Sequence, residues 1–169
     1  MPATFAFSET NGSAPGTPAN ITGGSIDFGN ADTHSDTLIP ASNPVTAGNR
    51  SFEKWIRGRW TGVFTSITNT KFYKSAGTAL TVSRIINGGT TTIAGYTTPT
   101  ASASAVATSD METHLTVGTA LLPLPPGAGG GTSGDPNFSE YVALQLVTTA
   151  AAPPGAIPTQ TYTLQWDET

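Results

Sequence analysis

Residues 141–148 read YVALQLVT, and residues 159–167 near the end of the chain read TQTYTLQWD. Every second position carries a large apolar side chain, namely Val142, Leu144 and Leu146, then Tyr162, Leu164 and Trp166. Because successive side chains of a β-strand point to opposite faces, this period predicts two strands that each bury one face. The Pro- and Gly-rich residues 150–158 between them predict a terminal hairpin with a long loop.

A further strand is predicted over residues 50–61, RSFEKWIRGRWT. The alternation places Trp55 and Trp60 on opposite faces of that strand and leaves open which ring is exposed. The pattern continues over residues 63–67, and KFYK at residues 71–74 begins the next strand. The centre of the chain is therefore expected to supply adjacent strands of a sheet.

Turn signals divide the rest of the chain. Asn-Gly-Gly at residues 87–89 separates the strand-like residues 80–86 and 90–96, which predicts a second hairpin. Asp110 is predicted to cap a short helical turn. Residues 121–135, LLPLPPGAGGGTSGD, predict an exposed mobile loop.

Composition limits the fold class. Charged residues are 11% of the 169 residues, against about 25% in ordinary domains, and the chain holds 19 Gly and 13 Pro. With abundant Thr, this mixture favours strands and turns over helices. We expect an all-β fold, a single β-sandwich or jelly-roll domain of about seven or eight strands. Residues 50–169 form its core, and residues 1–49 form an extended N-terminal arm with short strands.

Several classes of function lack support in the sequence. The chain has no Cys, which excludes disulfides and thiol nucleophiles. His34 and His114 lie far apart, and the glycines at 129–131 lack the Lys-Ser/Thr of a phosphate-binding loop. No apolar run approaches the roughly 18 residues of a membrane span, and the N-terminus does not resemble a signal peptide. We expect a non-enzymatic protein without a cofactor, a signal peptide or a transmembrane segment.

One polar stretch could hold a metal ion. Asp32, His34 and Asp36 alternate, so an extended segment would project all three to one side. Carboxylates suit Ca²⁺ and imidazole suits Zn²⁺. The spacing differs from an EF-hand loop, however, and Asp-rich loops are ordinary turn chemistry. The prediction is therefore that no metal is bound.

The charge distribution is the most informative feature. All seven basic residues lie within residues 50–84, which carry one acid, so this segment has a charge of +6 and the remainder a charge of −10. Two interpretations stay open: the bases pair with acids or solvent around buried aromatic rings, or they form a basic, aromatic-rich face that docks on an acidic partner. Nucleic acid is not expected, because the whole chain is acidic. The candidate interface residues are Arg50, Lys54, Trp55, Arg57, Arg59, Lys71 and Lys74.

A family resemblance rests on three stretches. SFEKWIRGRWTG at residues 51–62, ITNTKFY at 67–73 and QTYTLQWDE at 160–168 resemble virion structural proteins of tailed bacteriophages, of the head decoration or auxiliary capsid type. The resemblance implies a non-enzymatic module located on the virion that decorates or cements a capsid. It also implies that the partner is the major capsid protein or another virion protein, and that copies assemble as a homo-oligomer, with a trimer favoured.

An alternative function belongs to a different class. The chain could be a tail or fibre module that binds carbohydrate on the host surface, with Trp55 and Tyr73 stacked on sugar rings. The sequence leaves the head or tail location and the oligomeric state open.

Overall fold

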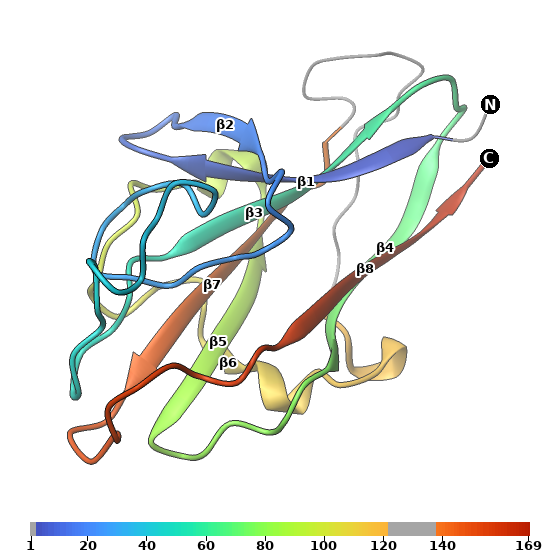
Figure 1. Ribbon diagram of the computed structural model, residues 1–169. Coiled ribbons are helices and arrows are strands. Elements are labelled where there is room, and N and C mark those ends of the chain that lie inside the picture. Colours follow the sequence, from blue (N-terminus) through green and yellow to red (C-terminus); the bar gives the residue numbers. More distant parts are fainter. Residues whose placement is uncertain (1–2, 122–137) are drawn as a thin grey trace.

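The computed structural model describes residues 3–121 and 138–169. Within these residues eight strands form two sheets, which confirms the expected all-β sandwich. The larger sheet has the order β2-β1-β3-β7-β5-β6, and β4 pairs with β8 in a separate two-stranded sheet (Figure 1). The strands are β1 Thr4–Asn11, β2 Thr17–Asn20, β3 Lys54–Thr61, β4 Ile67–Ala76, β5 Arg84–Thr91, β6 Ser109–Asp110, β7 Tyr141–Thr148 and β8 Thr161–Glu168.

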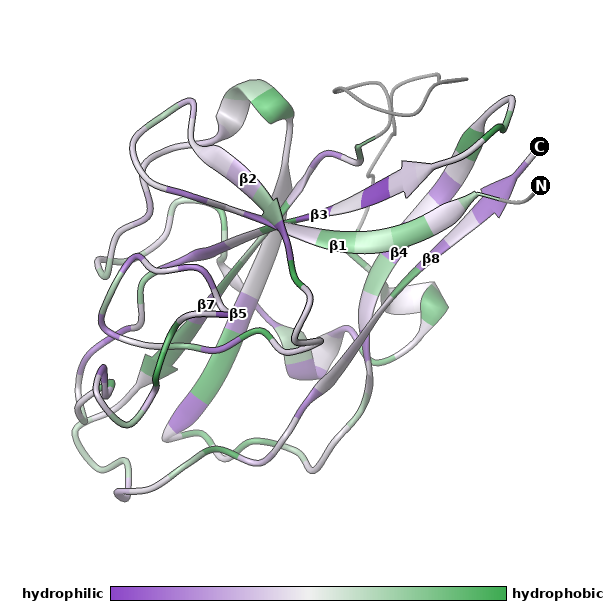
Figure 2. Cartoon of the chain, turned by 45° about the horizontal axis from the view of Figure 1, so that its top comes forward, coloured by the Kyte–Doolittle hydropathy of each residue, from purple (hydrophilic) through white to green (hydrophobic). Residues whose placement is uncertain are grey.

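Both faces of the six-stranded sheet are covered. Between the sheets, Trp60 of β3 and Leu144 of β7 pack with Phe72 of β4 and Leu164 of β8. Figure 2 shows the apolar residues along β5 and β7. A second cluster forms on the opposite face, and its members are Trp55, Tyr96, Ala107, Tyr141 and Ala143. Trp55 and Trp60 therefore lie on opposite faces as predicted, and neither is exposed.

The predicted hairpin at residues 87–89 is wrong. These residues lie inside β5, which pairs with β7 along Arg84–Thr91 without a turn. The glycines serve close packing: a Cβ on Gly88 would lie 2.3 Å from the Met111 sulfur, and a Cβ on Gly89 would lie 1.9 Å from the Val106 carbonyl oxygen. Glycine inside a strand often marks such a close approach.

The predicted terminal hairpin is also wrong. The strands β7 and β8 both exist, but β7 pairs with β3 and β5, whereas β8 pairs with β4 in the other sheet. The Pro- and Gly-rich residues between them cross from one sheet to the other. Nearly every residue of β7 is buried, because both faces of its sheet are covered.

The N-terminal segment differs from the expected arm. Residues 1–49 include β1, which pairs with β3 from Thr4 opposite Thr61 to Thr10 opposite Trp55. Phe5 and Phe7 of β1 pack against the core between the sheets. This segment therefore supplies a strand to the sheet of its own chain.

Three short 3₁₀ helices complete the fold: η1 Ile93–Gly95, η2 Met111–Thr113 and η3 Val117–Thr119. The helical turn predicted at Asp110 is confirmed, because the Asp110 side chain accepts a 2.9 Å hydrogen bond from the Glu112 amide at the start of η2. Most of the predicted loop at 121–135 lies outside the described residues.

Candidate functional site

Lys54, one of the seven candidate interface residues, is buried in the sheet. Its Nζ lies 3.0 Å from Oε1 of Glu9, and neither side chain has any exposed surface. The ammonium also donates to the Thr33 carbonyl oxygen at 2.6 Å. The strand alternation turns Lys54 toward the loop that contains Thr33, and β1 supplies the compensating acid.

Arg57 and Lys74 are buried as well. The Arg57 Nε donates to the Ser139 carbonyl at 2.6 Å, and its guanidinium lies over the rings of Phe138 and Tyr141, 4.5 and 5.0 Å from their centroids. Lys74 forms a 2.5 Å ion pair with Glu112. Both cations thus have their partners inside the chain.

The basic, aromatic-rich docking face is therefore not present as one surface. Trp55 is fully buried, with its ring 5.1 Å from that of Tyr96. The three other candidates are half-buried, and they are Arg50, Arg59 and Lys71. Of the two interpretations of the basic segment, the one in which the bases pair within the chain around buried aromatic rings describes Lys54, Arg57 and Lys74. A charged group buried in a sheet is costly unless it has such a partner.

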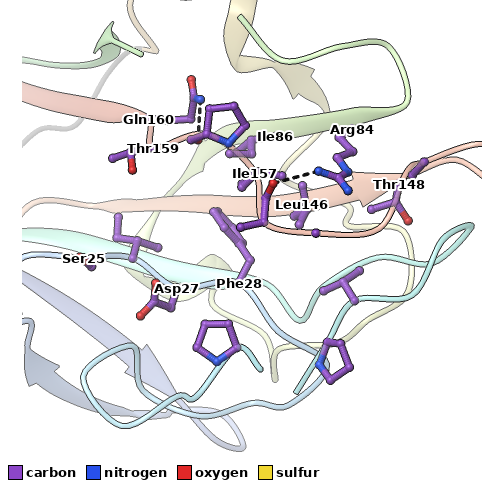
Figure 3. Close-up of a pocket in the computed structure, with 18 of the residues that line it drawn as sticks. Ser25, Asp27, Phe28, Arg84, Ile86, Leu146, Thr148, Ile157, Thr159 and Gln160 are labelled. Atoms are coloured by element: carbon purple, nitrogen blue, oxygen red, sulfur yellow. Dashed lines mark hydrogen bonds between the residues drawn. The ribbon is translucent and has the colours of Figure 1, made fainter. Parts of the chain in front are cut away.

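A groove of about 1090 Å³ opens in the layer above the six-stranded sheet (Figure 3). Phe7 of β1, Ile86 of β5 and Leu146 of β7 form its floor. The walls come from residues 21–28 and 40–47 on one side and 152–162 on the other. Their large half-buried apolar side chains are Ile21, Ile26, Phe28, Val45, Ile157 and Tyr162.

Arg84 holds one wall of the groove in place. Its Nη1 donates to the Ala156 carbonyl at 3.1 Å, and its Nη2 donates to the Pro153 carbonyl; Figure 3 draws one of these two bonds. These two hydrogen bonds tie the guanidinium to the loop between β7 and β8. Burial, followed by the charges of Glu112 and Asp110, raises the pKa of Tyr162, so this phenol at the end of the same wall is uncharged. The lining of the groove is mainly apolar, and its two charged side chains are Asp27 and Arg84.

The groove reaches the first residues of an unpaired strand edge. Thr161 and Tyr162, which begin β8, belong to its lining. Within residues 3–121 and 138–169, β8 has β4 as its one strand partner. An edge strand presents main-chain N–H and C=O groups that a further extended segment can pair with.

Sequence reasoning missed this groove. Val45 and Ile157 lie singly in loops rich in Pro, Gly and Asn, and the alternation of Ile26 and Phe28 spans only the four residues 25–28, which the sequence suggested as a short strand. Their only signal was that large apolar side chains recur in segments expected to be polar. They gather because the two-stranded sheet is too narrow to cover the six-stranded one.

The Asp32, His34 and Asp36 stretch fastens loops together. Asp32 accepts hydrogen bonds from the Asn11 side chain and the Gly12 amide, both at 2.9 Å. Asp36 accepts from the hydroxyl and amide of Thr22 and from the Gly23 amide, and the His34 Nε2 lies 3.2 Å from the Ala19 carbonyl oxygen. In the described part of the chain, no group of three or more His, Cys, Asp or Glu side chains could hold a metal ion.

Asp36 predicts a pH-dependent contribution to stability. The Thr22 hydroxyl, then the Thr22 and Gly23 amides, lower the pKa of Asp36 from 3.8 to about 2. Because the folded state prefers the ionised carboxylate, the stabilisation is complete above the ordinary pKa and is lost as the pH falls through about 2. We expect the difference in urea midpoint between the wild type and Asp36→Ala to be constant near neutrality and to shrink from about pH 4 toward pH 2. A difference that does not change over this range would contradict the assignment.

No helix in the described residues is long and apolar enough to cross a membrane. No protein-family model, no curated protein and no solved structure matches the chain.

Proposed function

We propose that this chain is a non-enzymatic structural protein of a phage virion, which decorates or cements the capsid. In this proposal the groove holds an extended segment of the major capsid protein or of another virion protein. The observation that carries it is the position of the groove, beside the unpaired edge of β8 and above the apolar floor formed by Phe7, Ile86 and Leu146.

An extended segment suits both parts of this site. Its main chain would pair with the free edge of β8, and alternate side chains would enter the groove. Such a strand buries apolar area and needs no charged partner. The lining agrees with this, because the guanidinium of Arg84 already donates to carbonyl groups of its own chain. The proposed partner is still a virion protein. The proposed binding surface is the groove and not the basic face, because Lys54, Trp55, Arg57 and Lys74 are buried.

The carbohydrate-binding alternative loses its main residue. Trp55 has no exposed surface and contacts Tyr96 and Tyr141 edge-to-face. It cannot stack on a sugar ring without unfolding the second core cluster. Tyr73 is half-buried on β4 and remains the one ring of that proposed pair that solvent reaches.

Co-sedimentation tests the proposal directly. The recombinant protein would be mixed with purified capsids and, separately, with purified tails of the phage that carries its gene, at low and high salt. We expect saturable binding to capsids that changes little with salt, because apolar contacts are not screened. Binding that disappears at high salt would point back to basic residues. Binding to tails alone, or to neither particle, would reject the capsid role. The trimeric assembly stays a prediction.

A further inference from the structure

Three side chains with complementary chemistry meet on one face of β1 and β3. Glu9 pairs in register with Ile56, and Thr10 pairs with Trp55. The next position of this antiparallel register places Asn11 across from Lys54, on the same face as Glu9. An amine, a carboxylate and a carboxamide are thus neighbours beneath the loop that contains Thr33 and Ser35.

The amine and the carboxamide share one carboxylate oxygen. The Lys54 Nζ lies 3.0 Å from Oε1 of Glu9, and the Asn11 Nδ2 donates to the same oxygen at 3.1 Å. The other oxygen of Glu9 accepts from the Ser35 amide at 2.9 Å, which fixes the carboxylate. Asn11 Oδ1 is buried and makes no hydrogen bond to the described residues. A simple ion pair would need no carboxamide at this point.

We propose that Lys54 and Asn11 become joined by an isopeptide bond, with Glu9 as the catalytic proton carrier. The Lys54 ammonium gives a proton to Glu9 and becomes a neutral amine with a free lone pair. That amine attacks Cγ of Asn11, so the Nζ–Cγ bond forms. Glu9 then returns its proton to Nδ2 and takes one from Nζ. The Cγ–Nδ2 bond breaks and ammonia leaves, carrying the remaining proton from Glu9 as ammonium. Nothing is oxidised or reduced.

The surroundings favour this reaction. Lys54 and Glu9 have no exposed side-chain surface, so water does not compete for the proton that passes between them in the proposed reaction. The protonated Glu9 can donate to the unpartnered Oδ1 and polarise Cγ. Asp32 holds the departing nitrogen, since its Oδ1 accepts from Asn11 Nδ2 at 2.9 Å. Asp32 and Asn11 are half-buried, so ammonium can leave on their side.

Mass spectrometry of the intact folded protein tests the proposal. The wild type is expected to be lighter than its sequence by one ammonia, and tandem spectra of a digest are expected to show the Asn11 peptide attached to the Lys54 peptide. Glu9→Gln keeps the shape but removes the proton carrier, so it is expected to have the full sequence mass. Glu53→Gln changes a second buried glutamate outside the cluster and is expected to keep the deficit.

Two results would overturn the proposal. The first is a wild type that has its full mass after prolonged incubation in the folded state. The second is a deficit without a cross-linked peptide, because Asn11 precedes Gly12 and cyclisation onto that backbone amide would also release ammonia. Lys54→Ala separates the two reactions, since cyclisation does not need the amine. If the substituted chains do not fold, the digest of the wild type still decides.

Discussion

Replacing Lys54 by methionine is expected to lower the free energy of unfolding by about 3 to 5 kcal/mol. The substitution keeps most of the side-chain volume but leaves the Glu9 carboxylate in a site with no exposed surface and without its cation. Removal of one partner of a buried pair is costly because the other charge stays desolvated. Urea unfolding of Asn11→Ala, in which the proposed cross-link cannot form, and of Asn11→Ala combined with Lys54→Met measures the loss of this ion pair.

The matched control for this prediction is the double variant Glu9→Leu with Lys54→Met. Removing both charges is expected to cost less than removing Lys54 alone, although the Ser35 amide then loses its acceptor. A loss below about 1 kcal/mol in Lys54→Met would mean that Glu9 is solvated in the protein. That result would also remove the dry site on which the proposed isopeptide bond depends.

The second large effect is expected at Gly89. A Cβ there would meet the Val106 carbonyl oxygen at 1.9 Å and its carbonyl carbon at 2.8 Å, and these backbone atoms cannot rotate away. Gly89→Ala should therefore displace the segment that covers Trp55 and lower the free energy of unfolding by about 3 kcal/mol.

Gly118→Ala is the matched control for Gly89→Ala. The nearest atom to a Cβ at Gly118 is the Thr116 hydroxyl oxygen, at 3.9 Å. The free energy of unfolding of this variant is therefore expected to lie within about 0.5 kcal/mol of the wild-type value. Equal stabilities of the two variants would show that residues 106 and 107 do not pack on β5.

Side-chain alternation predicted the strands well because it is a local property. The apolar period over YVALQLVT and TYTLQW corresponds to β7 and β8, and the pattern around Trp55 and Trp60 corresponds to β3. Pairing between strands is not local. A Pro- and Gly-rich connection of several residues can close a hairpin or cross between sheets, and its composition is the same in both cases.

The glycines of β5 illustrate a second limit. Asn87-Gly88-Gly89 has the composition of a hairpin turn, and sequence offers no sign that Met111 and Val106 will pack on those glycines. A glycine that is needed because a neighbouring atom packs where a Cβ would lie cannot be distinguished in a sequence from a glycine that is needed for a turn conformation.

The charge map predicted a real feature but not its location. Six of the seven basic residues lie on β3, β4 and β5, and the acids that pair with Lys54 and Lys74 come from distant positions: Glu9 lies 45 residues before Lys54, and Glu112 lies 38 residues after Lys74. Once these pairs form, the segment no longer presents a basic face. The groove escaped prediction because its walls are loops that come together only when both sheets are in place.

The most direct test of the proposed capsid role compares matched variants in the co-sedimentation assay. Val45→Asp places a charge in the groove wall, whereas Val63→Asp makes the same change at a side chain that is 76% exposed outside the groove. Arg59→Glu tests the remaining half-buried basic residue of β3. We expect Val45→Asp to weaken capsid binding by about tenfold or more, and the other two variants to bind like the wild type. Unchanged binding of Val45→Asp together with loss of binding in Arg59→Glu would contradict docking through the groove.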